Sequence, residues 1–186
     1  MLGESRLNVY ILGADLTTRQ RERLQAQVQT ALRSVPQWAF SLLDRRIEEM
    51  GVRNFPLIAE PLPPGSDETR SLSFGDLEGR PAAKLMPRLS DDTVMWGQDQ
   101  RYLVLKAVAY LASPPLTDRS FWEAWASAVE SDGLRSQAVA SAEGWDEATG
   151  LDLIVEMFAA YALSAGHARW ADLPTVRSFL ETWRSE

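Results

Sequence analysis

The stretch Leu103-Val-Leu-Lys-Ala-Val-Ala-Tyr-Leu-Ala112 carries one charged residue, Lys106, among apolar neighbours. Its length corresponds to about three turns of α-helix. A helix that is apolar on every side belongs in a core, packed between other elements. We therefore expect this segment to form a central helix around which the rest of the fold is built.

A second stretch, Leu151-Asp-Leu-Ile-Val-Glu-Met-Phe-Ala-Ala-Tyr-Ala-Leu-Ser-Ala165, has the same character, and its only charges are Asp152 and Glu156. A charge on such a helix must reach water or find a partner, because a buried unpaired ion costs several kcal/mol. Lys106 can extend its stem to water, and Asp152 with Glu156 can form an exposed i,i+4 stripe. Alternatively, Lys106 and Glu156 meet each other. The residues alone leave both interpretations open.

The first half of the chain mixes strand and helix patterns. Leu7, Val9 and Ile11 alternate with polar residues, which is typical of a half-buried strand. Thr17 followed by Gln20 is a capping-box pattern and predicts a helix start. A second helical pattern follows and should end at Gly51, and Asp91–Asp92 should cap a further helix.

Two more strand signals precede the central helix. Val52–Ala59 predicts a strand, which we place at the edge of a sheet because Pro56 cannot donate a ladder hydrogen bond. Leu72 and Phe74 alternate before the turn region Gly75–Gly79, so a β-hairpin is expected there.

The second half of the chain is helical. After the central helix, helices should start near Asp118, Asp146 and Asp172. The predicted fold class is therefore α+β, mostly helical, with a small mixed sheet and a hairpin. We expect one domain over 1–186, with strands and two helices in 1–95 and a helical bundle in 96–186.

Composition limits the chemistry and the partners. The chain has no cysteine, which excludes disulfides, thiolate zinc ligands and a cysteine nucleophile. The net charge of -7 disfavours nucleic acid and anionic membranes as partners. No apolar run reaches the roughly 18 residues of a membrane span, and no secretory signal is apparent, so we expect a cytoplasmic protein. The excess of arginine over lysine indicates a GC-rich bacterial source.

Three segments resemble the zincin metallopeptidases, in particular the compact bacterial branch of the anthrax lethal factor catalytic domain. Leu103–Leu111 is similar to the active-site helix that carries the family's His-Glu-x-x-His motif. Asp118–Trp125 is similar to the aromatic segment that follows that helix. Glu156–Tyr161 is similar to the Glu-x-Phe-Ala-Glu stretch, whose first glutamate is the third zinc ligand. The resemblance implies a zincin-like fold.

The zinc-binding residues of that family are replaced here. Leu105 and Ala109 stand where the two histidines should be, and Lys106 replaces the catalytic glutamate. A catalytic zinc needs two imidazoles at i and i+4 and a carboxylate that activates the bound water. We therefore expect no catalytic residues, no metal and no cofactor, and a vestigial site formed by Leu105, Lys106, Ala109, Glu156 and Asp152.

The loss of the histidines would leave Glu156 as a carboxylate without its cation. We predict that the Lys106 ammonium lies within salt-bridge reach of Glu156 or Asp152. Replacement of Lys106 by alanine would then cost roughly 3 kcal/mol or more, as for breaking a buried ion pair.

Trp122 and Trp125 lie three residues apart on one predicted helix and share a face. They could pack in the core, or they could form a surface for a partner, since tryptophan is enriched at binding hot spots.

Three functions remain open. The first is a non-catalytic metallopeptidase-like domain that binds or regulates a protein or peptide, with the strand near Leu57 pairing with an extended peptide. The second is a carboxylate-based hydrolase that uses Glu156 and Asp152. The third is a small acidic interaction protein of immunity or antitoxin type with a basic partner.

Overall fold

The computed structural model describes residues 6–63, 66, 71–90, 93–134 and 147–185. The chain divides into two compact units, 1–112 and 113–186. The first unit contains all the strands of the described residues, and the second unit is helical. The α+β prediction, with a small mixed sheet and a hairpin, is confirmed. A single domain over 1–186 stays a prediction, and the central helix belongs to the first unit.

A four-stranded sheet forms the base of the first unit. Its order is β1 (Leu7–Ile11), β2 (Phe55–Ala59), β4 (Arg80–Leu85) and β3 (Leu72–Leu77). Strands β1, β2 and β4 are parallel, whereas β3 runs antiparallel to β4. The sheet is therefore mixed, and β1 and β3 are its two edge strands.

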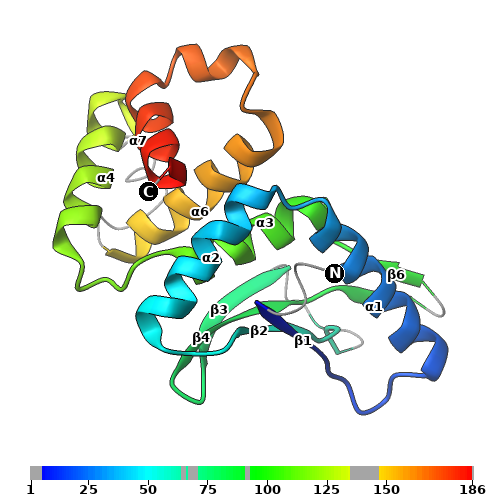
Figure 1. The fold of residues 1–186 in the computed structure, drawn as a ribbon. Helices are drawn as coiled ribbons and strands as arrows, with labels where there is room; N and C mark the ends of the chain where they lie inside the picture. The colour runs from blue at the N-terminus through cyan, green and yellow to red at the C-terminus, as the bar shows by residue number, and fades with distance from the viewer. Residues whose placement is uncertain (1–5, 64–65, 67–70, 91–92, 135–146, 186) are drawn as a thin grey trace. The chain divides into compact units, whose positions relative to one another are not determined.

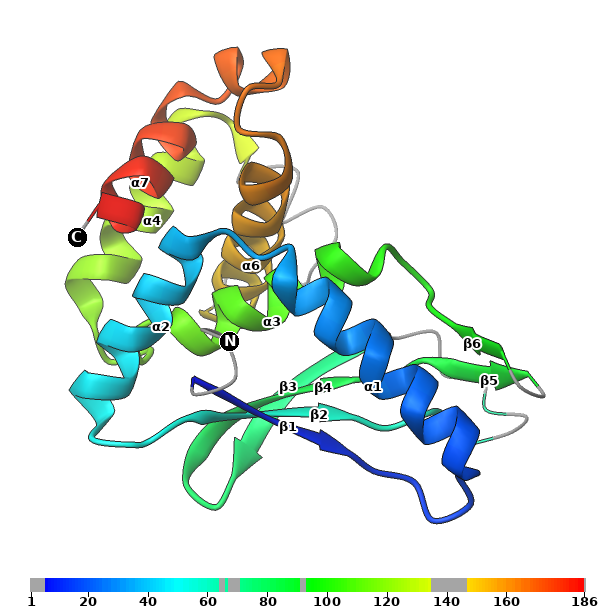
Figure 2. The same ribbon diagram turned by 45° about the vertical axis from the view of Figure 1, so that its right-hand side comes forward.

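Three helices cover one face of this sheet (Figures 1 and 2). They are α1 (Thr18–Arg33), α2 (Gln37–Met50) and α3 (Gln100–Ala112). Thr17 and Gln20 form the predicted capping box at the start of α1. Gly51 ends α2 in the left-handed conformation, with φ of 64°, as expected. Every second residue of β2, from Phe55 to Ala59, is fully buried.

The placement of β2 at a sheet edge was wrong, because β2 lies between β1 and β4. The Phe55 amide donates to Arg6 on the β1 side, so the Pro56 nitrogen faces the β4 side. Pairing with β4 begins only at Leu57, opposite Ala83. Pro56 therefore costs the sheet no ladder hydrogen bond, and the strand tolerates it in a central position.

The predicted hairpin is formed by β3 and β4. Its turn is Glu78–Gly79, with φ of 56° and 76°, the pattern of a two-residue type I′ turn. A second, unpredicted hairpin joins β5 (Arg88–Ser90) and β6 (Thr93–Met95). Asp91–Asp92 lie outside the described residues, and the segment after them is a strand, so the helix expected there was wrong.

Helix α3 occupies the core of the first unit, in agreement with its apolar sequence. Eight of its residues are buried. They are Leu103, Val104, Leu105, Ala107, Val108, Ala109, Leu111 and Ala112. The helix packs against α1, α2, β3 and β4, and its half-buried residues Tyr102, Lys106 and Tyr110 form one narrow stripe at spacings of four.

In the second unit, the described residues form α4 (Arg119–Ser131), α6 (Glu147–Ser164), the 3₁₀ helix η1 (Ala168–Ala171) and α7 (Pro174–Ser185). Asp118 caps α4 as predicted, and Asp146 lies outside the described residues. The Asp132 carboxylate accepts hydrogen bonds from the Thr175 and Val176 amides, at 3.2 and 2.7 Å, and so caps α7 from the end of α4. Within the described residues, every helix is too short or too polar to cross a bilayer.

Candidate functional site

Helix α3 carries the three positions that the suggested resemblance aligns with the zincin motif. Leu105 and Ala109 are both 0% exposed and form part of the apolar core. Lys106 is half-buried, and its ammonium lies 5.7 Å from the centre of the Tyr102 ring, a cation-π contact one helical turn away. The side chains present at positions 105, 106 and 109 offer no ligand for a zinc ion, so they do not fit the metal that the family resemblance implies.

The remaining residues of the candidate vestigial site lie on α6, in the second unit. Asp152 is exposed and Glu156 is half-buried. Because Lys106 belongs to the first unit, its salt bridge with Glu156 or Asp152 stays a prediction. Within the part of the chain that the structure describes, no three His, Asp or Glu side chains gather as a metal-binding group.

The two tryptophans of α4 have different surroundings. Trp125 is 0% exposed, and its indole nitrogen donates to the Gly150 carbonyl at 3.0 Å. Its ring centre lies 5.2 Å from that of Phe179 on α7. Trp122 is half-buried and donates to the Pro115 carbonyl at 3.0 Å. Trp125 is thus a core residue of the second unit, and only Trp122 has surface available to a partner.

Within the described residues, no strand pairs with the outer edge of β3. The Met86 amide donates to the Ser71 carbonyl at 2.8 Å. This bond determines which residues of β3 direct their backbone groups toward β4. Odd-numbered residues of β3 therefore bond to β4, and the even-numbered residues, Leu72, Phe74 and Asp76, direct their N–H and C=O groups away from it. Such an edge is a template for an additional strand.

The opposite edge of the sheet is partly blocked. The outward-facing Ile11 carbonyl of β1 accepts a hydrogen bond from the Arg21 guanidinium at 2.6 Å. The same guanidinium donates to the Gly13 carbonyl at 3.2 Å. Because this charged side chain from α1 covers the end of β1, β3 is the more accessible of the two edge strands.

An aromatic pair fastens β3 to α3. The rings of Phe74 and Tyr110 stack with centres 4.3 Å apart and planes 11° from parallel. The Tyr110 hydroxyl also donates to the Gly75 carbonyl at 3.1 Å. Burial raises the pKa of Tyr110, and the Asp76 carboxylate raises it further. Asp76 and the stacked rings therefore lie close together on one side of the strand edge.

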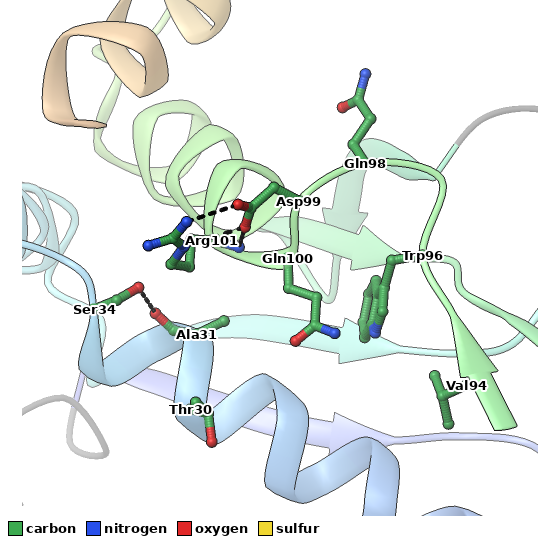
Figure 3. Close-up of a pocket in the computed structure, with 9 residues that line it drawn as sticks. All are labelled: Thr30, Ala31, Ser34, Val94, Trp96, Gln98, Asp99, Gln100 and Arg101. Carbon is green, nitrogen blue, oxygen red and sulfur yellow. Dashed lines mark hydrogen bonds and ion pairs between the residues drawn. The ribbon is translucent and has the colours of Figure 1, made fainter. Parts of the chain in front are cut away.

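A pocket of about 550 Å³ lies at the start of α3 (Figure 3). Its walls come from α1, β6 and the segment between β6 and α3. Nine residues line it: Thr30, Ala31, Ser34, Val94, Trp96, Gln98, Asp99, Gln100 and Arg101.

The two charged residues of this pocket bind each other, and its indole binds a residue outside the lining. Asp99 accepts from the Arg101 amide at 2.8 Å and pairs with its guanidinium at 2.9 Å. The hydrogen bonds from Arg101 lower the pKa of Asp99. The Trp96 indole donates to Gln27 at 2.9 Å. The one acid and the one base of the lining neutralise each other, so the pocket favours no charged ligand.

Comparisons of this chain with protein-family models, with curated proteins and with solved structures gave no match. The edge of β3 was missed in the sequence, although the alternation of Leu72 and Phe74 was the signal for it. The hydrogen bond from Arg21 to the end of β1 could not be predicted from a local sequence pattern, since it joins a strand to a helical residue ten positions away.

Proposed function

We propose that this protein is a non-catalytic, metallopeptidase-like domain that binds an extended peptide along the outer edge of β3. The observation that supports this most directly is the row of outward-facing backbone groups at Leu72, Phe74 and Asp76, beside the stacked rings of Phe74 and Tyr110. Main-chain hydrogen bonds supply affinity in β-addition, and neighbouring side chains supply selectivity. The strand near Leu57 is central and cannot take this role.

The metallopeptidase-like part of the proposal rests on the order of the elements and on α3. A sheet with a hairpin precedes a core helix, and that helix is followed by one rich in aromatic residues and one carrying Glu156. At the two positions where the family has zinc-binding histidines, the side chains are buried and apolar. A domain of this kind can keep a peptide-binding edge after the hydrolytic chemistry has been lost.

Proline at position 72 tests the peptide-binding edge. Leu72→Pro removes an outward N–H but no hydrogen bond to β4, so the hairpin should remain folded. We expect peptide affinity to fall by about 1 kcal/mol, roughly fivefold, for the lost hydrogen bond. Two peptides with acetylated and amidated ends serve as probes: Thr-Lys-Thr-Phe-Thr-Leu-Thr and the same peptide with its sequence reversed. Calorimetry measures the affinity of the protein for each peptide. Hydrogen exchange of the β3 amides shows whether the peptide binds at this edge.

Leu72→Ala is the matched control, because it removes the same side chain and keeps the N–H. It should bind peptide more tightly than Leu72→Pro. Mass spectrometry should find the peptide intact after incubation with the protein, with or without added zinc. Equal affinities of the proline and alanine variants, or no slowing of exchange at residues 72, 74 and 76 on adding peptide, would contradict binding at this edge.

A double-mutant cycle tests the predicted ion pair between Lys106 and Glu156. Glu156→Gln keeps the length of the side chain, Lys106→Met shortens it by one atom, and both remove the charge. If the ammonium neutralises the carboxylate, each single variant should destabilise the protein, and the double variant should lose about 1 kcal/mol less than the sum of the two. Denaturant unfolding followed by circular dichroism gives these free energies. Additive effects would show that the two charges do not interact, and the cycle of Lys106→Met with Asp152→Asn tests the alternative partner.

A further inference from the structure

The side chains of β3 that share a face with the helices define what an added strand would meet. Residues alternate between the faces of a strand, and Phe74 stacks on Tyr110 of α3. Leu72, Phe74 and Asp76 therefore project on the α3 side of the sheet, opposite Leu85, Ala83 and Pro81 of β4. Leu72 and Phe74 are half-buried, and Asp76 is exposed. Along the free edge the order is aliphatic, aromatic, acidic.

Asp76 is the charge available at one end of this row. One of its carboxylate oxygens accepts a hydrogen bond from the Gly79 amide at 2.8 Å, which holds the side chain in the turn. The neighbouring acid, Glu78, already pairs with Arg80 at 3.3 Å. Among the described residues, Asp76 forms no ion pair, so its charge is free to attract a cation from an added strand.

Directly opposed side chains of adjacent strands interact, and opposite charges or apolar pairs stabilise the pairing. We propose, on the basis of the proposed function, that the β3 edge selects an extended segment with a basic, an aromatic and an aliphatic residue at alternating positions. The basic side chain pairs with Asp76, the aromatic one contacts the Phe74 and Tyr110 rings, and the aliphatic one covers Leu72. The net charge of -7 on the protein also favours a cationic segment.

Peptides that differ only in one charge test this selectivity. The Lys-containing probes of both sequence orders are compared with versions that carry Glu in place of Lys. The better-bound Lys peptide should bind about fivefold more tightly than its Glu version, the size of one cross-strand ion pair. The ratio should shrink at 0.5 M salt, where the screening length falls to a few ångströms, on the order of 4 Å.

Asp76→Asn separates the charge from the turn, because the amide oxygen can still accept from Gly79. In this variant the ratio of the affinities for the Lys and Glu peptides should fall to about the small preference that the net charge of the protein supplies, with affinity for an Ala-substituted peptide unchanged. Glu78→Gln, in the same turn, should leave the ratio as in the wild type. An unchanged ratio in Asp76→Asn, or no discrimination by the wild type, would overturn this selectivity while peptide binding itself persists. If the wild-type protein bound none of these peptides and its β3 amides were not protected from exchange, the proposed function itself would be rejected.

Discussion

Replacement of Trp125 by alanine is expected to destabilise the second unit by about 3–5 kcal/mol, the usual cost of deleting a large buried aromatic side chain. Trp125 is fully buried between α4, α6 and α7, where its ring lies next to Phe179 and its N–H reaches Gly150. No small rearrangement can refill that volume, because α6 and α7 are held by other aromatic contacts, including Phe158 against Trp183 at 5.3 Å.

Two variants separate the contributions to this loss. Trp125→Phe keeps most of the apolar volume and removes the hydrogen bond to Gly150, so its cost should be intermediate. Trp122→Ala removes a half-buried ring and should cost clearly less than Trp125→Ala. Denaturant unfolding followed by circular dichroism measures all three. A loss below about 1 kcal/mol for Trp125→Ala would mean that this residue does not hold the unit together, and that the surface interpretation of the tryptophan pair should be revived.

The helix boundaries of this protein could be predicted because their determinants are local. The Thr17 side chain bonds to an amide three residues away, and the Asp118 side chain does the same at α4. Gly51 adopts a backbone conformation that few other residues accept. Each of these signals lies within one helical turn of the boundary that it marks.

The order of the strands depends on contacts that the sequence does not reveal. Pro56 is acceptable in a central strand only because pairing with β4 starts one residue later, at Leu57. The strands Arg88–Ser90 and Thr93–Met95 are too short to show a period, so their hairpin was missed. The capping of α7 by Asp132 joins residues more than forty positions apart and leaves no local trace.

The candidate site was predicted in part. The apolar character of Leu103–Ala112 placed Leu105 and Ala109 in the core, and both are fully buried. The strand near Leu57 was wrongly placed at a sheet edge, because the choice between a central and an edge strand depends on pairing partners. The contact of Lys106 with a carboxylate stays a prediction. The neighbouring Tyr102 ring, 5.7 Å from the ammonium on the same helix, was not predicted.

Introducing the metallopeptidase motif into α3 should convert the protein into one that zinc stabilises. The variant combines Leu105→His, Lys106→Glu and Ala109→His, which places two imidazoles at i and i+4 on α3. If the chain has the zincin-like arrangement that we propose, Glu156 supplies the third ligand. We expect a lower Tm than wild type in EDTA and a large rise in Tm with one equivalent of zinc.

The expected changes in the free energy of unfolding are large enough for the effect of zinc to be measured. Loss of the buried Leu105 side chain costs about 2–5 kcal/mol, and enlarging Ala109 in a packed core costs about 1–3 kcal/mol. Zinc that binds only the folded protein stabilises it by RT ln(1 + [L]/Kd), about 4 kcal/mol when the free zinc concentration is 1,000 times the Kd. Zinc should therefore offset a large part of the damage, provided that the protein is not already unfolded without it, which circular dichroism in EDTA establishes first.

Two controls make the zinc response specific to the proposed geometry. Adding Glu156→Gln to the triple variant should abolish most of the rise in Tm, because the third ligand is lost. Placing the second histidine at Ala107, also buried, instead of Ala109 puts the two imidazoles on different faces of α3 and should bind zinc weakly. A rise in Tm that survives Glu156→Gln, or that is equal for the two histidine placements, would show that α3 and Glu156 do not form a zincin-like site.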